Sequence, residues 1–357
     1  MAARREENGT WSTSFRYSDW EGKSRLKHAR GFKEEAEANA FERDFKRMAS
    51  GKSGMPFEVF AEKYLEDIEP RVRPTTYETR ERMIRVKIVP LFKGSLVCEI
   101  TSLDVLHAQN VLLAQRKPDG SEYSPVYIRR ISEQVWGMFN HAVDNYELEE
   151  NPCRSLRQAG SKKNGEMKIW SKAELNLFLD AVSDKPLIYY AFETLYWTGI
   201  REGELLALTP SDLDFRACTL TVSKTYHRRG GKDVIGPPKT ACSYRTISMP
   251  QFLCDDLRRF IRDVAKTQPD ERIFAGLNKK KLLRAMSRGC AASGVKAIRV
   301  HDLRHSHVST LIKMGFSVVA IAERMGHESS DITLRYAHLF PSAQAEMADA
   351  LQAARGK

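Results

Sequence analysis

Near the start of the chain, polar and apolar residues alternate, and the next residues place apolar side chains at helical spacing. In residues 9–29, the Thr-, Ser- and aromatic-rich stretches TWSTSFRY and SRLKHA flank the turn sequence DWEGK. This pattern predicts a small hairpin or sheet. Residues 33–49 then place apolar side chains at helical spacing. We therefore expect a small N-terminal domain, residues 1–50, that combines a sheet with one helix.

Helical periodicity marks the next segment, residues 55–157. The polar, basic stretch QAGSKKNGEMK follows it and has the composition of a linker. The helical patterns are an apolar stripe at 57–65, a segment that starts at Pro74, and the stretches 102–116 and 124–146.

The third segment, residues 166–357, mixes both periods. Ser171 and Glu174 form a capping box at the start of a helix. TLTVSKTY (219–226) and YRTISM (244–249) indicate strands joined by a long basic loop, HRRGGKDVIGPPKTACS. Helices are expected at 172–182 and 186–197, from about 302 to a turn at Met314-Gly315, and from there to Gly326.

These patterns predict a multidomain, mainly α protein. Its parts are a small N-terminal β-sheet plus helix, a helical second domain, and a mixed α/β third domain that is mostly helical with a small antiparallel sheet. The length of 357 residues suits two or three domains. No apolar run reaches the roughly 20 residues of a membrane span, and the opening MAARREENGT has no signal-peptide pattern. We expect a cytoplasmic protein without a membrane partner.

The net charge of +11 comes almost entirely from residues 161–357, which are the end of the linker and the third segment and hold 31 Lys and Arg against 21 Asp and Glu. A basic domain suggests a polyanionic partner, most often nucleic acid. The second segment contains a basic cluster, and two interpretations are open: a face that contacts phosphates or a solvated face. The candidate DNA contacts are Arg80, Arg82, Arg85 and Lys87 there, with Arg228 and Arg229 in the basic loop.

The six cysteines are scattered without C-x-x-C spacing. This argues against a zinc ribbon or a disulfide framework and fits a reducing compartment. We expect all six to be small buried hydrophobes. They are Cys98, Cys153, Cys218, Cys242, Cys254 and Cys290.

The stretch HDLRHSH (301–307) offers a possible metal site. His301 and His305 have the spacing of two ligands on a helix, with Asp302 as a general base and Glu323 as a third ligand. However, Arg304 lies beside both histidines, and its permanent charge disfavours a dication. A guanidinium instead binds two phosphate oxygens at once. The sequence therefore favours an anion at this stretch, and we expect no metal and no cofactor.

Several further motifs stand in a fixed order around HDLRH. They are TGIREGEL (198–205), PKT followed by YRTI (238–247), MGH (325–327) and TLRYAH (333–338). Together with HDLRH they resemble the tyrosine recombinase (phage integrase) family. The second segment resembles that family's core-binding domain. The first is similar to the arm-binding domains of integrases from conjugative transposons and phages.

The resemblance implies a role for each matching residue. Tyr336 is expected to be the nucleophile that attacks a DNA phosphate. Arg201 and Arg304 are expected to clamp its non-bridging oxygens. Lys239 is expected to protonate the departing 5′ oxygen, although Lys224 and Lys232 lie in or beside the same hairpin. The resemblance also implies a reaction without metal or ATP. Rejoining is expected to need no ATP because the phosphotyrosyl bond retains the energy of the broken linkage.

The remaining matches support this chemistry. His301 is expected to assist proton transfer, His327 to hydrogen-bond the phosphate, and Glu204 to orient the site from behind. A tyrosine with an ordinary pKa of about 10 is a poor nucleophile at neutral pH. Neighbouring cations would lower that pKa and stabilise charge on the phosphate.

The resemblance also implies partners. We expect double-stranded DNA, a homo-tetramer on DNA, and an accessory DNA-bending or excision factor. The helix predicted at 341–354, PSAQAEMADALQAA, would dock on a neighbouring protomer, or else pack on its own domain. The competing functions are a type IB topoisomerase-like nicking-closing enzyme, a non-enzymatic DNA-binding protein and a zinc metalloprotease.

Overall fold

In the computed structural model, residues 3–161, 167–238, 240–326 and 352 are described. The chain divides into two compact units, residues 1–165 and 166–357. Within the part of the chain that the structure describes, no helix has the length and apolar character needed to cross a bilayer.

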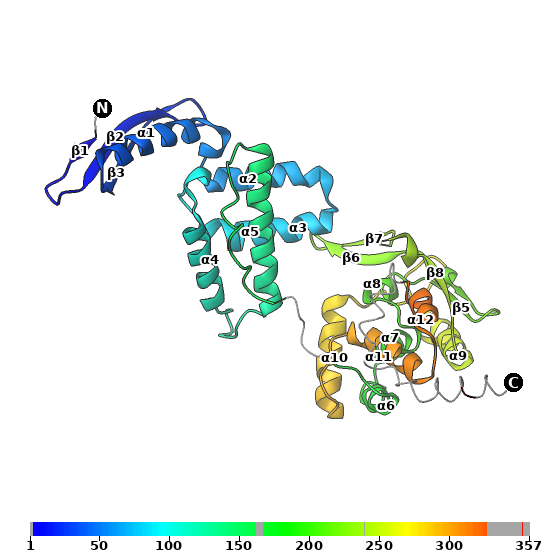
Figure 1. Cartoon of the computed structure of the whole chain (residues 1–357). Coiled ribbons are helices and arrows are strands. Elements are labelled where there is room, and N and C mark those ends of the chain that lie inside the picture. Colours follow the sequence, from blue (N-terminus) through cyan, green and yellow to red (C-terminus); the bar gives the residue numbers. More distant parts are fainter. Residues whose placement is uncertain (1–2, 162–166, 239, 327–351, 353–357) are drawn as a thin grey trace. The chain divides into compact units, whose positions relative to one another are not determined.

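The first unit begins with a three-stranded antiparallel sheet in the order β1-β2-β3 (Figure 1). The strands are β1 (Arg4–Arg5), β2 (Trp11–Ser18) and β3 (Ser24–Phe32), followed by helix α1 (Glu35–Ser50). The predicted turn lies between β2 and β3, where the Asp19 side chain accepts the backbone N–H of Lys23 at 2.8 Å. Phe15 of β2 packs edge-on against Phe45 of α1 at 5.6 Å. The expected sheet plus helix is confirmed.

The rest of the first unit is helical, as the periodicity predicts. Its helices are α2 (Phe57–Ile68), α3 (Pro74–Met83), α4 (Ser102–Ala114) and α5 (Pro125–Asn145), and a π-helical turn, Ile84–Ile88, extends α3. Phe57, Phe60 and Phe139 are fully buried between α2 and α5. Burial of a large side chain contributes about 2 kcal/mol, so the aromatic core supplies much of this domain's stability.

The second unit has a core of α-helices with two small antiparallel sheets at one side of it (Figure 1). The capping box is present: Ser171 and Glu174 begin α6. The helices are α6 (Lys172–Asp180), α7 (Pro186–Thr198), α8 (Glu202–Leu205), α9 (Gln251–Phe260), α10 (Lys279–Ser293), α11 (Asp302–Lys313) and α12 (Val318–Met325). The strands are β4 (Leu213–Asp214), β5 (Thr219–Val222), β6 (Thr225–Arg229), β7 (Lys232–Gly236) and β8 (Arg245–Ser248).

One element prediction was wrong in detail. The predicted strand 219–226 divides between β5 and β6, and the long basic loop after it contains a second hairpin, β6–β7. Gly230 and Gly231 form its turn with φ of +53° and +82°. Two residues with positive φ allow the tight turn whose twist matches a hairpin. The Gly230-Gly231 dipeptide in the sequence could therefore have predicted this hairpin.

The cysteines also differ from expectation. All six are free thiols, and Cys153, Cys254 and Cys290 are buried. Cys242 is exposed, and Cys98 and Cys218 are half-buried. The prediction that all six are buried was wrong because Cys242 lies in the exposed turn that leads into β8.

Candidate active site

Arg201 lies where α7 ends and α8 begins. Gly199 ends α7 in the left-handed conformation, with φ of +68°, and the chain then turns so that Arg201 precedes α8. The Arg201 backbone N–H donates to Glu204 Oε2 at 2.8 Å, and its Nη1 donates to Glu204 Oε1 at 2.8 Å. The Arg201 side chain is 37% exposed and that of Glu204 only 3%. The guanidinium is thus accessible, while the carboxylate that holds it is buried.

Glu204 is shared between two arginines. Arg245, from β8, donates Nη2 to Glu204 Oε2 at 2.8 Å and Nη1 to Oε1 at 3.3 Å. Burial by itself would raise the pKa of Glu204, but the hydrogen bond and charge of Arg245, and the charge of Arg201, lower it to about 2. The carboxylate is therefore ionised at neutral pH and fixes both guanidinium groups.

Backbone carbonyls hold the second arginine of the site. Arg304, in the first turn of α11, is buried. Its Nη1 donates to the carbonyl of Gly199 at 2.7 Å, and its Nη2 to the carbonyl of Met325. These carbonyls end α7 and α12, and both helices stop at a left-handed glycine, Gly199 and Gly326. Helix C-termini carry partial negative charge, so they stabilise a guanidinium there.

The same helix end approaches Arg201. Its Nη2 lies 3.4 Å from the Gly326 carbonyl, and its Nη1 lies 3.4 Å from Ser243 Oγ. The fold thus brings Arg201 and Arg304, 103 positions apart in sequence, to consecutive carbonyls at the end of α12. Two cations this close to one another form a preorganised site for an anion.

His301 stands just before α11, with its ring edge-on to that of His305 at 5.1 Å. The residue keeps solvent contact, but the protein around the ring removes water from the charged form. This desolvation, with the charges of His305 and Arg304, lowers the pKa of His301 to about 4. The imidazole is therefore neutral at pH 7 and is able to accept a proton.

The alternative metal site gains no support from the arrangement of these groups. Asp302 Oδ1 accepts Arg299 Nη2 at 2.8 Å, and Asp302 Oδ2 accepts the Arg299 backbone N–H at 2.9 Å. Glu323 is exposed on α12. Over residues 3–161, 167–238 and 240–326, no three His, Cys, Asp or Glu side chains converge as metal ligands would.

His307 is a buried structural residue. Its Nε2 accepts Arg324 Nε at 3.1 Å, and Arg324 Nη1 in turn donates to the Ser248 carbonyl at 3.1 Å. Burial, and then the Arg324 charge, lower the pKa of His307 to about 3. A neutral His307 thus links α11 and α12 to the small sheet.

Comparison with known proteins agrees with this arrangement. The model of the phage integrase family matches residues 170–342, that of the phage integrase N-terminal SAM-like domain matches 56–113, and that of an arm DNA-binding domain matches 2–48. The chain belongs to the phage integrase family of tyrosine recombinases.

Integrases from two other sources match this chain over more than half of its length. The ICEBs1 integrase of Bacillus subtilis (strain 168) is 29% identical over 324 residues, which cover 87% of this chain and 86% of that protein. The integrase of Mycobacterium phage L5 is 26% identical over 221 residues, 59% of this chain and 58% of that one.

Solved structures show the same fold. The Tn1549 transposon integrase, solved in complex with transposon right end DNA, superposes with a TM-score of 0.66 at 21% identity and covers 84% of this chain and 99% of that chain. A lambda integrase dimer bound to a COC′ core site gives 0.60 at 16% identity and covers 94% of each chain. The predicted mainly α fold class with small antiparallel sheets is confirmed.

Three of the six predicted catalytic residues of this recombinase, Lys239, His327 and Tyr336, lie outside the described residues, as does the predicted helix 341–354. Of the alternatives to Lys239, Lys224 donates to Thr209 Oγ1 at 2.8 Å and lies 3.0 Å from Asp212 Oδ2. Lys224 thus has two internal partners, and whether it shares the role of Lys239 stays a prediction. Lys232 is exposed at the start of β7.

The basic residues proposed to contact DNA from the second segment do not form one free face. Arg80 and Arg82 lie in the last turn of α3. Arg85 is 2.8 Å from Glu62 Oε2, and Lys87 donates to Tyr123 OH at 2.7 Å while its ammonium covers the Tyr123 ring at 4.3 Å. Arg85 and Lys87 therefore have internal partners, and their role as DNA contacts stays a prediction.

The hairpin β6–β7 holds the other two candidates. Arg228 and Arg229 are both exposed in β6, and Arg228 Nε donates to the Gly231 carbonyl at 2.9 Å. Arg228 Nε also lies 3.9 Å from Asp233 Oδ1. The role of both arginines as DNA contacts stays a prediction.

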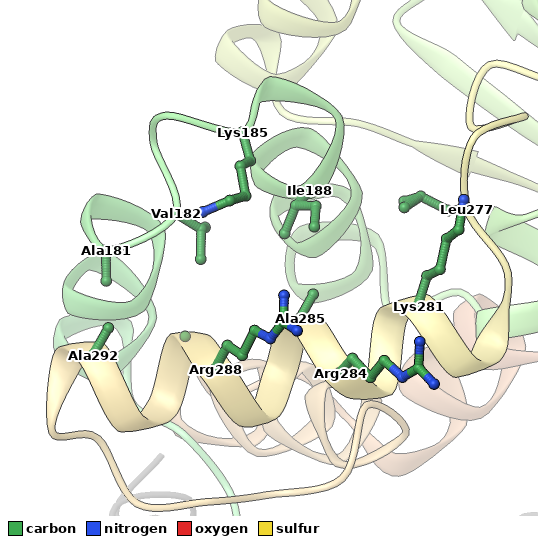
Figure 2. Close-up of a pocket in the computed structure, with 11 residues that line it drawn as sticks. Ala181, Val182, Lys185, Ile188, Leu277, Lys281, Arg284, Ala285, Arg288 and Ala292 are labelled. Atoms are coloured by element: carbon green, nitrogen blue, oxygen red, sulfur yellow. The ribbon is translucent and has the colours of Figure 1, made fainter.

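Arg245 is a site residue that sequence reasoning missed. It is the arginine of the YRTI motif, and its place in that motif could have marked it as a site residue. Only the fold shows that it shares Glu204 with Arg201. A second missed feature is a cavity of about 350 Å³ between α10 and the α6–α7 turn (Figure 2). Its rim carries four exposed cations and its floor is apolar. The cations are Lys185, Lys281, Arg284 and Arg288.

Proposed function

We propose that this chain is a site-specific DNA recombinase. It cuts and rejoins DNA through a 3′-phosphotyrosyl intermediate and thereby integrates and excises a mobile element. The observation that carries the proposal is the convergence of Arg201 and Arg304 on the carbonyls that end α12, next to a neutral His301. Such a pair of fixed cations suits a phosphodiester.

In the proposed first step, the Tyr336 hydroxyl attacks the scissile phosphorus. His301 assists removal of the phenolic proton, since its lowered pKa keeps it unprotonated at neutral pH. Arg201 and Arg304 bind the equatorial oxygens, on which negative charge increases in the transition state. The phosphorus–oxygen bond to the 5′ oxygen breaks, and Lys239 supplies the proton to that oxygen.

The second step reverses the first with a different strand. A 5′-hydroxyl attacks the phosphotyrosine, the Tyr336 oxygen leaves, and a phosphodiester is restored. His327 is proposed to hydrogen-bond the phosphate in both steps. Glu204 keeps the Arg201 guanidinium oriented throughout.

We further propose three functional domains: arm-DNA binding at 1–50, core-DNA binding at 55–157 and catalysis at 166–357. The partners are double-stranded DNA, other copies in a tetramer, and an accessory bending or excision factor. The two solved integrases named above are complexes with DNA, which supports the DNA partner.

The deciding experiment traps the covalent intermediate. Nicked duplexes with the junction sequences that flank the gene are incubated with the protein in EDTA and resolved under denaturing conditions. We expect a covalent protein–DNA adduct that disappears in Tyr336→Phe and persists in Tyr244→Phe, a change at an exposed tyrosine. An adduct that needs a metal, or that survives Tyr336→Phe, would disprove the mechanism.

The tetramer has its own test. Deletion of residues 341–357 removes the predicted exchange helix, and we expect adduct formation on single sites to continue while tetramers on DNA are lost in sedimentation. Unchanged tetramers would exclude exchange through this helix, and relaxation of plasmid DNA without strand exchange would favour the topoisomerase alternative.

A further inference from the structure

Two of the scattered cysteines meet in the folded second unit. Cys218 ends the turn that joins β4 to β5, and Cys254 lies in the first half of α9. Cys218 is half-buried, whereas Cys254 is buried. Cys218 also has a left-handed backbone, with φ of +51°, which is uncommon for a residue other than glycine.

A shared acceptor brings the two thiols together. The Sγ atoms of Cys218 and Cys254 lie 4.0 and 3.8 Å from the same oxygen, the carbonyl of Phe215. Burial, and then contact with the Cys218 thiol, raise the pKa of Cys254 to about 11. The two side chains therefore interact directly, although 35 residues separate them in sequence.

Further hydrogen bonds fix the turn against α9. Cys218 Sγ donates to Gln251 Oε1 at 3.2 Å, and the Met249 backbone N–H donates to the Cys218 carbonyl at 2.7 Å. These contacts hold the turn that carries Cys218 against the helix that carries Cys254.

We propose that Cys218 and Cys254 are a modification site that forms a reversible intramolecular disulfide with a small-molecule disulfide such as oxidised glutathione. Cys218, the more accessible thiol, loses its proton and attacks the reagent, which releases one glutathione thiolate and leaves a mixed disulfide. Cys254 then loses its proton and attacks the Cys218 sulfur, which releases the second glutathione. The two cysteines are oxidised and one glutathione disulfide is reduced to two thiols.

The disulfide would connect α9 to the sheet that carries Arg245. Strand β5 begins directly after Cys218 and pairs with β8, where Val222 lies opposite Arg245. Closing this loop restricts the unfolded chain. The melting temperature of the oxidised protein should therefore rise by roughly 5 to 10 °C. This site is independent of the recombinase proposal.

The test uses the full-length protein in buffers of increasing oxidised-to-reduced glutathione ratio. We expect a cross-linked peptide pair containing Cys218 and Cys254 that is about 2 Da lighter than the two reduced peptides, and the loss of two titratable thiols beyond any that the exposed Cys242 loses to glutathione. Reduction should reverse both changes. Cys242→Ser, which removes the exposed thiol, serves as the matched control and should still lose two thiols.

Single variants separate the two steps. In Cys254→Ala the mixed disulfide has no internal partner, so the protein should instead gain one glutathione at Cys218. In Cys218→Ser neither the internal disulfide nor that adduct should form. The proposal is wrong if the wild type keeps six thiols under conditions that glutathionylate Cys254→Ala, or if the peptide pair involves other cysteines.

Discussion

Glu204 holds two arginines with one buried carboxylate. It bonds Arg201 on one side and Arg245 on the other, and its pKa of about 2 keeps it ionised. A neutral side chain here would leave both guanidinium groups with less compensating charge, and the Arg245 side chain is only 7% exposed.

Glu204→Gln should therefore destabilise the catalytic unit by about 3 kcal/mol and slow formation of the covalent adduct by about 100-fold. Urea unfolding and adduct time courses measure the two effects. Glu202→Gln, two residues away and half-buried, is the control and should leave the adduct rate unchanged. An adduct rate unaffected by Glu204→Gln would show that Arg201 needs no orienting partner.

Glu193 makes stability depend on pH. It is buried in α7, and its Oε2 has no hydrogen-bond partner within the described residues. Burial, and then the charge of Asp256, raise its pKa to about 7. A raised folded pKa means that its favourable contribution is complete below the unfolded value of 4.5 and is lost as pH rises through 7.

Glu193→Gln should consequently stabilise the protein at pH 8.5 by about 2 to 3 kcal/mol and change it little at pH 5. Chemical denaturation at the two pH values measures this difference. A gain of equal size at both would mean that ionisation of Glu193 is not the cause.

His307 acts in the opposite direction. Its folded pKa, about 3, lies below its ordinary value of 6.5, so its contribution is present above pH 6.5 and is lost as pH falls toward 3. The contribution of Glu193 decreases above pH 4.5 and that of His307 decreases below pH 6.5. The free energy of unfolding should therefore be greatest between these two pH values.

At the scale of elements, two left-handed helix ends build the arginine site. Gly199 and Gly326 stop α7 and α12, and the carbonyls at these ends accept Arg304 and Arg201. A Cβ on Gly199 would lie 2.6 Å from His307 Cδ2 and 2.9 Å from Met325 Cε. Both the conformation and the close packing therefore require glycine.

Gly199→Ala tests this requirement against Gly294→Ala. Both glycines end helices with similar φ, +68° and +71°, but a Cβ at Gly294 meets nothing within 4 Å. Gly294→Ala should cost only the conformational term, about 1 kcal/mol. Gly199→Ala should cost more than about 3 kcal/mol and also reduce adduct formation. If thermal unfolding shows the same loss of stability in both variants, close packing around Gly199 does not contribute to the requirement for glycine.

At the scale of the whole molecule, part of the positive charge of the third segment gathers on one helix that the motifs did not single out. Helix α10 exposes Lys279, Lys280 and Lys281 together with Arg284 and Arg288, and it contains no acidic residue. Three of these cations border the cavity in Figure 2. A face of this kind suits the phosphates of DNA.

The double substitution Arg284→Ala and Arg288→Ala should weaken DNA binding and reduce the slope of log K against log salt by about 1 to 2, since each phosphate contact contributes about 0.9. Fluorescence anisotropy over a range of salt concentrations measures both. Arg262→Ala, an exposed arginine already paired with Asp263, is the control. An unchanged slope in the double variant would exclude this face as a DNA contact.

The sequence by itself determined the order of domains, the helices and the motifs. Periodicity and capping depend on neighbours within a few positions, so the start at Pro74 and the capping box at Ser171 were readable from local residues. The motifs pointed to the family because residue types at fixed spacing, such as HDLRH, carry chemistry whatever their distance in space.

Only the tertiary structure decided which side chains meet. Arg245 joins Glu204, Arg304 reaches the end of α12, and Cys218 meets Cys254 through contacts between segments 21 to 41 positions apart. No local pattern encodes such pairs, because they depend on how helices and strands pack. The same packing decided that Lys224 and Lys87 are held by internal partners, a distinction that charge along the chain does not contain.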